Sequence, residues 1–252
     1  MAEIVDLTGR VVLVTGGTRG VGRGIAARFT DVGATVVVCG RNEPEDAAPG
    51  AAFLTCDVRD ADQVDALVSV IVEQHGRLDV VVNNAGGSPP AEAATASPRF
   101  TQRIIELNLL APLYVSQAAN RAMQQQLEGG SIINIASLSG IRPSPGTTAY
   151  GAAKAGLISA TQSLAQEWAP MVRVNAVVVG LVRTEQAELF YGDESAQARV
   201  AATVPIGRFA EPTDVGDVCL FLASPLAAYV TGAAIEAHGG GERPPFLGAA
   251  EG

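Results

Sequence analysis

The stretch VVLVTGGTRGVG at residues 11–22 decides the fold. It begins with an aliphatic run, continues into a glycine-rich loop and leads into a segment with the apolar spacing of a helix. A short buried strand that turns sharply into a helix is typical of the first unit of an α/β sheet. Glycine lets the backbone turn tightly, and the following helix N-terminus presents free N–H groups to an anion. The stretch therefore predicts a dinucleotide-binding unit; the alternative is a glycine-rich turn with no ligand.

The same alternation of strand and helix patterns continues along the chain. Apolar runs predicted to be strands lie at Val11–Val14, Thr35–Cys39, Ala52–Thr55, Val80–Val82, Ser131–Ile135, Val172–Val179 and Ala233–Ala237. Helical patterns lie at Val21–Val32, Ala61–His75, Pro98–Gln126, Ala149–Trp168 and Pro212–Ala223. Strands that are apolar throughout, each followed by a helix, favour a parallel sheet covered on both faces. We expect an α/β fold with a Rossmann-like, doubly wound sheet, whose ligands bind beyond the carboxyl ends of the strands.

Length and composition favour one globular domain. The chain has 252 residues, 48% of them hydrophobic, which is enough for a large core. We expect a single domain over residues 1–252, with its core at about 7–240 and a flexible tail after about residue 240. A net charge of −9 disfavours nucleic acids and anionic membranes as partners. The acidic N-terminus, the lack of a long apolar run and three cysteines without metal or disulfide spacing favour a cytoplasmic protein that needs no metal.

The glycine-rich loop and the end of the second strand bear on the cofactor. The loop residues expected to meet it are Gly16, Thr18, Arg19, Gly20, Val21 and Gly22. The second strand ends at Arg41 without the carboxylate that usually bonds the ribose hydroxyls of NAD. Arg19 and Arg41 can clamp a 2′-phosphate instead, so we expect NADP(H) in preference to NAD(H). Glu43 and Glu45 follow closely and temper this preference, and the alternative is that both arginines are solvated surface residues.

A single lysine points to the chemistry. Of 17 basic residues only Lys154 is a lysine, and it follows Tyr150 by four positions, which places both on one helix face. A phenol is a poor base at neutral pH, and a neighbouring cation lowers its pKa. A compact ammonium can lie below the phenol oxygen and also bond a ribose, which a planar guanidinium does poorly. We therefore expect Tyr150 to act as acid and base with Lys154 as its support; the alternative is an exposed pair on a helix surface.

A serine that can bond the substrate oxygen follows the strand at 131–135. Ser137 lies just past this strand end, where a hydroxyl can orient a reacting carbonyl. Ser139 is the competing candidate, although serine next to glycine is common in turns.

Taken together, these residues closely resemble the short-chain dehydrogenase/reductase family in its compact single-domain branch, over about residues 7–240. The motifs that carry the resemblance are Thr15-Gly16 through Gly22, Asn83-Asn84-Ala85-Gly86, Asn108-Leu109, Ser137, Tyr150 with Lys154, and Tyr229-Val230-Thr231-Gly232. Two departures stand out. The usual Pro-Gly after the sixth strand is Val179-Gly180 here, which predicts a more flexible floor for the nicotinamide pocket. The segment between Arg41 and Phe53 is short, so the helix usual there is expected to be truncated or missing.

The resemblance implies roles for residues that spacing alone does not single out. Asn108 would support a proton-relaying water beside Lys154, and Ser137 would orient the carbonyl. The remaining residues implied to contact the cofactor are Asp57, Val58, Asn84, Ala85, Gly86, Gly180, Val182 and Thr184. Family members commonly form tetramers through their two long helices, so we expect a homo-oligomer, a tetramer or dimer, that buries residues such as Leu157 and Leu164.

The expected activity is hydride transfer between NAD(P)(H) and a carbonyl or secondary alcohol. The substrate is a small molecule, with a 3-oxoacyl thioester and an alicyclic or steroid-like ketone as the two candidates. Residues Glu185–Tyr191 are expected to form a mobile lid whose apolar side chains meet the substrate; the alternative is that these side chains pack a short helix against the core. The alternative is a catalytically silent dinucleotide-binding regulator or scaffold, which need not have kept Ser137, Tyr150 and Lys154 together.

Overall fold

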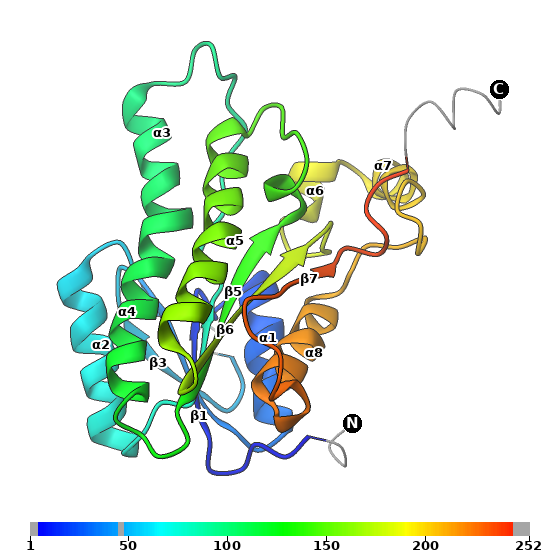
Figure 1. Ribbon diagram of the computed structural model, residues 1–252. Helices are drawn as coiled ribbons and strands as arrows, with labels where there is room; N and C mark the ends of the chain where they lie inside the picture. The colour runs from blue at the N-terminus through cyan, green and yellow to red at the C-terminus, as the bar shows by residue number, and fades with distance from the viewer. Residues whose placement is uncertain (1–4, 45–47, 244–252) are drawn as a thin grey trace.

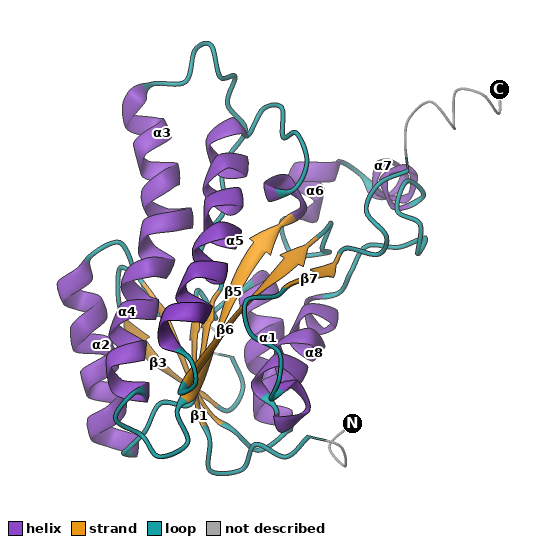
Figure 2. Cartoon of the chain, in the orientation of Figure 1, coloured by secondary structure: helices purple, strands orange, loops and turns teal. Residues whose placement is uncertain are grey.

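Seven parallel strands form the central layer of the molecule (Figure 2). The computed structural model describes residues 5–44 and 48–243. The strands are β1 (Val11–Thr15), β2 (Thr35–Gly40), β3 (Ala51–Thr55), β4 (Val80–Asn83), β5 (Gly130–Ser137), β6 (Val172–Val179) and β7 (Ala234–Ala237), in the order β3-β2-β1-β4-β5-β6-β7. Every paired neighbour runs parallel. The sequence prediction of a doubly wound sheet is confirmed.

Helices cover both faces of this sheet (Figure 1). One face packs α1 (Gly20–Asp31) and α8 (Pro212–Ala223), and the other packs α2 (Ala61–His75), α4 (Ala111–Met123) and α5 (Thr148–Trp168). The first strand shows why both layers are needed. Val12 and Val14 point to the α1 side while Val11 and Leu13 point to the α2 side, and all four are buried. Because successive side chains alternate between the faces, a strand that is apolar throughout needs a cover on each side.

Capping residues fix where several helices begin, and they explain the agreement with the predicted boundaries. Asp60 accepts hydrogen bonds from the N–H groups of Asp62 and Gln63 at the start of α2, and Gly76 ends that helix in the left-handed conformation. Ser97 caps α3 (Pro98–Ile105) in the same way. The described residues between Arg41 and Phe53 contain no helix, as the sequence predicts; residues 45–47 lie outside the described part of the chain.

The long helix predicted at Pro98–Gln126 is wrong as a single regular helix. The structure has α3, then a π-helical turn η1 (Glu106–Leu110), then α4. Asn108 lies in this turn, and its side-chain amide donates to the carbonyls of Ile104 and Gly87 at 2.9 and 3.0 Å. A π-turn of this kind is often found at functional sites, because the extra residue re-aims a side chain.

The predicted oligomer residues also need a correction. Leu157 is 1% exposed within a single chain. Leu164 packs against the part of the core that lies between the sheet and the helices α2, α4 and α5. Leu157 is therefore a core residue of α5 and has no surface to offer a partner subunit.

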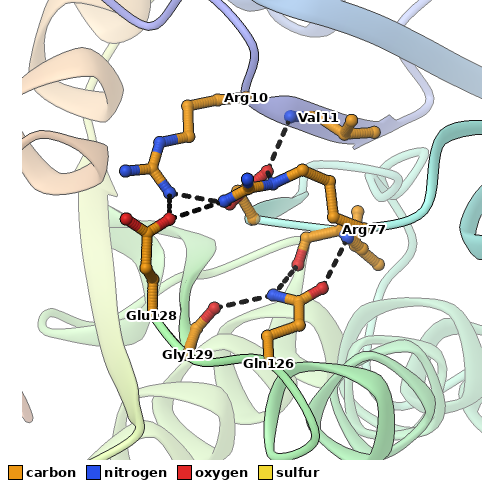
Figure 3. A network of polar contacts seen from close by, with 8 residues as sticks. Arg10, Val11, Arg77, Gln126, Glu128 and Gly129 are labelled. Atoms are coloured by element: carbon orange, nitrogen blue, oxygen red, sulfur yellow. Dashed lines mark hydrogen bonds and ion pairs between the residues drawn. The ribbon is translucent and has the colours of Figure 1, made fainter.

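Polar side chains close the sheet at the end of the strands opposite to the glycine-rich loop (Figure 3). Asp79, just before β4, is 5% exposed and accepts from the backbone N–H of Val11 at 2.8 Å. Its carboxylate also accepts from Arg77 at 2.8 Å and from Arg10 at 3.0 Å, and both arginines reach the exposed Glu128. These bonds hold the pKa of Arg77 above its ordinary value. A buried carboxylate with this many donors ties the start of β1 to β4.

We expect Asp79→Ala to lower the free energy of unfolding by about 2–3 kcal/mol, because it leaves the buried N–H of Val11 without its acceptor and removes the buried partner of Arg10 and Arg77. Glu128→Gln is the matched control and should cost clearly less than Asp79→Ala, since the Glu128 carboxylate is exposed and screened by solvent. Urea unfolding followed by circular dichroism measures both values. Equal losses for the two variants would show that Asp79 does not anchor the sheet.

Candidate active site

One cavity of about 780 Å³ opens at the carboxyl ends of the strands, where the sequence predicts the ligand site. It is lined by all the residues that were predicted to contact the cofactor: Gly16, Thr18, Arg19, Gly20, Val21, Gly22, Arg41, Asp57, Val58, Asn84, Ala85, Gly86, Tyr150, Lys154, Gly180, Val182 and Thr184. Ser137 lines it as well, whereas Ser139 does not. Residues from most of the length of the chain therefore meet in one place.

The glycine-rich loop is held in shape by β4 and the turn that follows it. Asn84 donates from its side chain to the carbonyl oxygens of Thr15 and Gly16 at 2.9 and 3.2 Å, and Thr15 Oγ1 accepts from the backbone of Asn84 and Ala85. Gly16 has a φ of 62°, a left-handed value that favours glycine. A Cβ on Gly22 would come within 2.3 Å of the Gly16 oxygen. The loop thus leaves room only for backbone.

Asn83 braces the sheet beside this loop. Its side-chain amide donates to Ser116 on α4 at 2.9 Å and to Asn134 on β5 at 2.8 Å. Asn134 in turn donates to Thr161 on α5 at 2.9 Å. This buried chain of bonds ties β4 and β5 to α4, which follows the turn that carries Asn108, and to α5, which carries Tyr150.

Arginines surround the β2 end of the cavity. Arg19 and Arg41 are exposed and line it, and Arg59 lines it as well, a residue that the sequence analysis did not single out. Arg59 donates to both carboxylate oxygens of Asp57, at 2.9 and 2.5 Å. This pairing, together with the charge of Arg41, holds the pKa of Asp57 below its usual value. The guanidinium of Arg59 thus partly neutralises the one carboxylate that the resemblance places beside the adenine.

A second carboxylate reaches the glycine-rich loop from far away in the sequence. Glu185 accepts from the backbone N–H of Gly20 at 3.2 Å, at the first residue of α1. A carboxylate at a helix N-terminus is favourable because the free N–H groups and the helix dipole attract a negative charge. The contact shows that this N–H is directed into the cavity as an anion donor.

The other end of the cavity holds Ser137, Tyr150 and Lys154. Ser137 ends β5 and lines the same part of the cavity as Tyr150, and its side chain lowers the pKa of the Tyr150 phenol. Lys154 lies one turn further along α5, is 2% exposed, and donates from Nζ to the carbonyl of Ile135 at 2.8 Å. Its Nζ is 5.6 Å from the centre of the Tyr150 ring. The helix spacing and the strand end together bring the hydroxyl, phenol and ammonium to one wall.

Asn108 lies behind that wall and does not line the cavity. It is fully buried, and its side-chain oxygen accepts from the N–H of Gly87 at 2.8 Å. A Cβ on Gly86 would meet Asn108 Oδ1 at 2.7 Å and Lys154 Nζ at 3.4 Å. Asn108 and Lys154 therefore approach the same glycine from different sides.

The chain matches known proteins over nearly its whole length. A family model described as Enoyl-(Acyl carrier protein) reductase matches residues 16–242. A 3alpha-hydroxysteroid dehydrogenase of Mediterraneibacter gnavus is 36% identical over 92% of this chain and 97% of that protein. The 3-oxoacyl-[acyl-carrier-protein] reductase FabG of Thermotoga maritima is 36% identical over 93% of this chain and 98% of that protein.

The chain belongs to the short-chain dehydrogenase/reductase family. A crystal structure of a putative short-chain alcohol dehydrogenase from Sinorhizobium meliloti 1021 superposes with a TM-score of 0.86. It is 38% identical and covers 93% of this chain and 97% of its own. This protein is accordingly an oxidoreductase that acts on a carbonyl or alcohol group.

Burial dominates the electrostatics of the phenol and the ammonium in this dehydrogenase/reductase. Burial raises the pKa of Tyr150 above its ordinary value, and the Ser137 side chain lowers it by less. Burial lowers the pKa of Lys154 from 10.5 to about 8. The net direction for the Tyr150 phenol is thus opposite to the lowering that the sequence predicts, because burial is the largest effect; that Lys154 favours the phenolate stays a prediction. A raised pKa keeps the phenol protonated at neutral pH, which is the form that donates a proton.

The floor of the nicotinamide end is set by β6 and β7. Val179, which replaces the usual proline, stays within β6, and Gly180 donates to the carbonyl of Ala237 at 3.3 Å. A Cβ on Gly180 would come within 2.8 Å of the His238 Cα, so this position needs glycine. The hydrogen bond continues the β6–β7 pairing past the end of the strand and ties the floor to β7.

The segment predicted to form a lid, Glu185–Tyr191, contains the short helix α6 (Ala187–Tyr191), and α7 (Glu194–Ala201) follows it; Glu185, Gln186 and Tyr191 line the cavity. Tyr191 lines the cavity and stacks on Phe209 with ring centres 5.0 Å apart. Its neighbourhood supplies an apolar, aromatic surface near Tyr150. None of the helices within the described residues has the length and apolar character to cross a membrane, and those residues contain no cluster of three or more His, Cys, Asp or Glu side chains placed to hold a metal.

Proposed function

We propose that this protein is an NADP(H)-dependent reductase of a ketone, working in the reverse direction as a secondary-alcohol dehydrogenase, in which Tyr150 carries the proton. The observation that supports it most strongly is the single cavity with an anion-binding loop at one end and the Ser137–Tyr150–Lys154 wall at the other. We extend the proposal to a dimer or tetramer of the chain.

The residues present fit a dinucleotide. The loop at Gly16 and Gly22 leaves no space for side chains, and Gly20 offers its N–H to an anion, as its bond to Glu185 demonstrates. These features suit a pyrophosphate held against backbone at a helix N-terminus. When bound, the nicotinamide ring supplies the hydride in reduction and accepts it in oxidation.

The protein's own groups would manage the proton and the carbonyl oxygen. Ser137 would donate to the carbonyl oxygen of the substrate and align it with the Tyr150 hydroxyl. Tyr150 would then give its proton to that oxygen as negative charge develops there, which is general acid catalysis. Lys154, held by Ile135 on one side, would direct its remaining donors to the nicotinamide ribose and favour the phenolate that is left behind.

The arginines at the β2 end support NADP(H) as the preferred cofactor. A 2′-phosphate there would meet Arg41 and Arg19, and the nearby carboxylate of Asp57 is already paired with Arg59. We expect Arg41→Ala to weaken NADPH binding by roughly 10- to 100-fold, because a charge-assisted bond contributes about 1.5–3 kcal/mol. NADH binding should change by less than about 3-fold.

Fluorescence titration of both cofactors into wild-type protein, Arg41→Ala and the distant control Arg208→Ala tests this preference. Equal affinities of the wild-type protein for NADPH and NADH would overturn it. The same samples, given NADPH and a panel of acetoacetyl-coenzyme A, decalone and a 3-oxosteroid, test the activity. Oxidation of NADPH with any of them supports a reductase. Tight NADPH binding with no turnover on the whole panel would favour the alternative of a silent cofactor-binding regulator.

Tyr191 and Phe209 support a substrate with an apolar body. Tyr191 lines the cavity, and the buried Phe209 ring stacks behind it with ring centres 5.0 Å apart. An alicyclic or steroid-like ketone and a 3-oxoacyl thioester both have such a body, and the net charge of −9 weighs against an acidic carrier protein as the bearer of the thioester.

A further inference from the structure

Arg142 follows a turn that is connected to Ser137 and packs against Lys154, two of the predicted catalytic residues. The turn η2 (Leu138–Gly140) follows Ser137 directly, and the N–H of Arg142 donates to the carbonyl of Leu138 at 3.2 Å. Gly140 packs against the backbone of Lys154, since a Cβ there would come within 2.9 Å of it. Arg142 is thus fixed five positions after Ser137 on a turn that contacts α5.

The guanidinium of Arg142 is only partly used. Nη1 donates to the carbonyl of Pro143 and Nη2 to Glu242 Oε1, both at 2.7 Å. Nε is shielded from solvent and has no hydrogen-bond partner among the described residues. Nε and Nη2 share one edge of the guanidinium, which is the edge that a carboxylate can take with both oxygens. Glu242 fills half of it and leaves the buried Nε–H without an acceptor, which is unfavourable.

Glu242 belongs to a segment that glycines connect to the sheet. Gly239, Gly240 and Gly241 all have positive φ, and they lead from the end of β7 to Glu242. The segment lies beside α6 and α7 at the carboxyl end of β5 and β6 (Figure 1). Apart from the Arg142–Glu242 pair, backbone bonds from Ile206 to Gly239 and from Arg243 to Thr203 connect this segment to its neighbours, at 3.1 and 2.9 Å. Three successive glycines leave Glu242 free to swing away at little cost.

The Arg142–Glu242 pair adjoins two stretches that contribute to the cavity wall: Arg142 follows the turn after Ser137, and the Glu242 segment lies beside α6, which carries Tyr191 (Figure 1). The charge of Glu242 also raises the pKa of Tyr191, in addition to the larger effect of burial. Tyr191 lines the cavity, and its charge raises the pKa of Tyr150 as a minor contribution beside burial. The pair is therefore on the Tyr191 side of the phenol, apart from the loops that line the cofactor end.

We propose that Arg142 is a specificity-determining residue that binds a carboxylate carried by the ketone substrate, and that Glu242 occupies this place until the substrate displaces it. This inference rests on the proposed reductase activity. A substrate carboxylate would take both Nε and Nη2, satisfy the donor that Glu242 leaves without a partner, and so compete with a side chain that makes a single bond.

The test compares keto acids with their uncharged esters. Levulinate and its next two homologues, each one methylene longer, are assayed for kcat/KM with NADPH beside their methyl esters. The wild-type protein should prefer the acid over the ester by about 10-fold or more for at least one chain length. Arg142→Gln should reduce this acid-to-ester ratio by roughly 10- to 100-fold. Glu242→Gln should raise kcat/KM for the acid several-fold through a lower KM, because the competing carboxylate is gone.

Arg208→Gln is the matched control, since Arg208 forms a comparable partly exposed ion pair with Asp214 on α8. It should leave the acid-to-ester ratio within about twofold. The inference would be overturned if the kcat/KM of the ester equalled or exceeded that of the acid at every chain length. It would also be overturned if Arg142→Gln left the acid-to-ester ratio unchanged. Turnover of the esters alone would leave the reductase proposal standing. If neither acids nor esters are reduced, calorimetric titration of the acids into the protein with NADPH present decides: no binding, or equal binding to Arg142→Gln, also overturns it.

Discussion

Replacing Tyr150 by phenylalanine should lower kcat for ketone reduction by about a thousand-fold, within the range that a positioned general acid contributes. The variant removes one oxygen and leaves the ring. That oxygen belongs to a half-buried phenol that lines the cavity together with Ser137, and its raised pKa keeps it protonated at neutral pH. NADPH affinity should change by less than about 3-fold, because the rest of the cavity is untouched. Steady-state and single-turnover kinetics with NADPH measure the loss.

Tyr114→Phe is the matched control for this prediction. Tyr114 packs on α4 against the core beside α2 and does not line the cavity, so losing its hydroxyl should leave kcat within about twofold. If Tyr150→Phe keeps more than about a tenth of the wild-type kcat, the proton comes from elsewhere, and the roles given to Ser137 and Lys154 lose their basis.

Local signals explain how much of the fold the sequence predicts. Strand positions follow from runs of buried aliphatic residues, and helix starts follow from side chains that cap within three residues, such as Asp60 and Ser97. The π-turn at Asn108 has no such signal. It depends on a bond to Gly87, which is 21 positions away and belongs to another loop. A helical pattern through 98–126 therefore looks continuous in the sequence.

The candidate site divides in the same way. Tyr150 and Lys154 are visible because a helix brings residues four apart to one face, and the loop glycines are visible because their spacing is local. The roles of Glu185 and Arg142 are not visible in the sequence. Glu185 bonds to Gly20 across 165 positions, and Arg142 meets Glu242 across 100. Nothing in a single sequence pairs residues so distant. The direction of the Tyr150 pKa was missed for a related reason, since it depends on how deeply the tertiary fold buries the phenol.

Lys154→Met should abolish most of the activity and at the same time stabilise the fold. A methionine cannot hold the ribose or favour the phenolate, so kcat/KM should fall by more than about a hundred-fold. The stability gain comes from burial, which lowers the pKa of Lys154 to about 8 from 10.5. At neutral pH the folded protein keeps this ammonium in a dry site, which costs up to about 3 kcal/mol relative to the unfolded chain. Loss of the bond to Ile135 offsets part of the gain, and we expect a net increase of about 1–2 kcal/mol.

The pH dependence gives this prediction its sharpest test. Between pH 8 and 10.5 the unfolded chain binds a proton at Lys154 that the folded protein has released. Stability contributed by this group therefore rises with pH across that window and is lowest below it. Lys154→Met lacks this term, so its advantage over the wild-type protein in urea unfolding should be largest at pH 7 and shrink towards pH 10.5. A variant that is less stable at pH 7, by a margin independent of pH, would mean that the ammonium is well solvated or well paired in the folded protein. In that case the lowered pKa of Lys154 would be wrong. The inference that the buried ammonium destabilises the fold while it supports Tyr150 would be wrong as well.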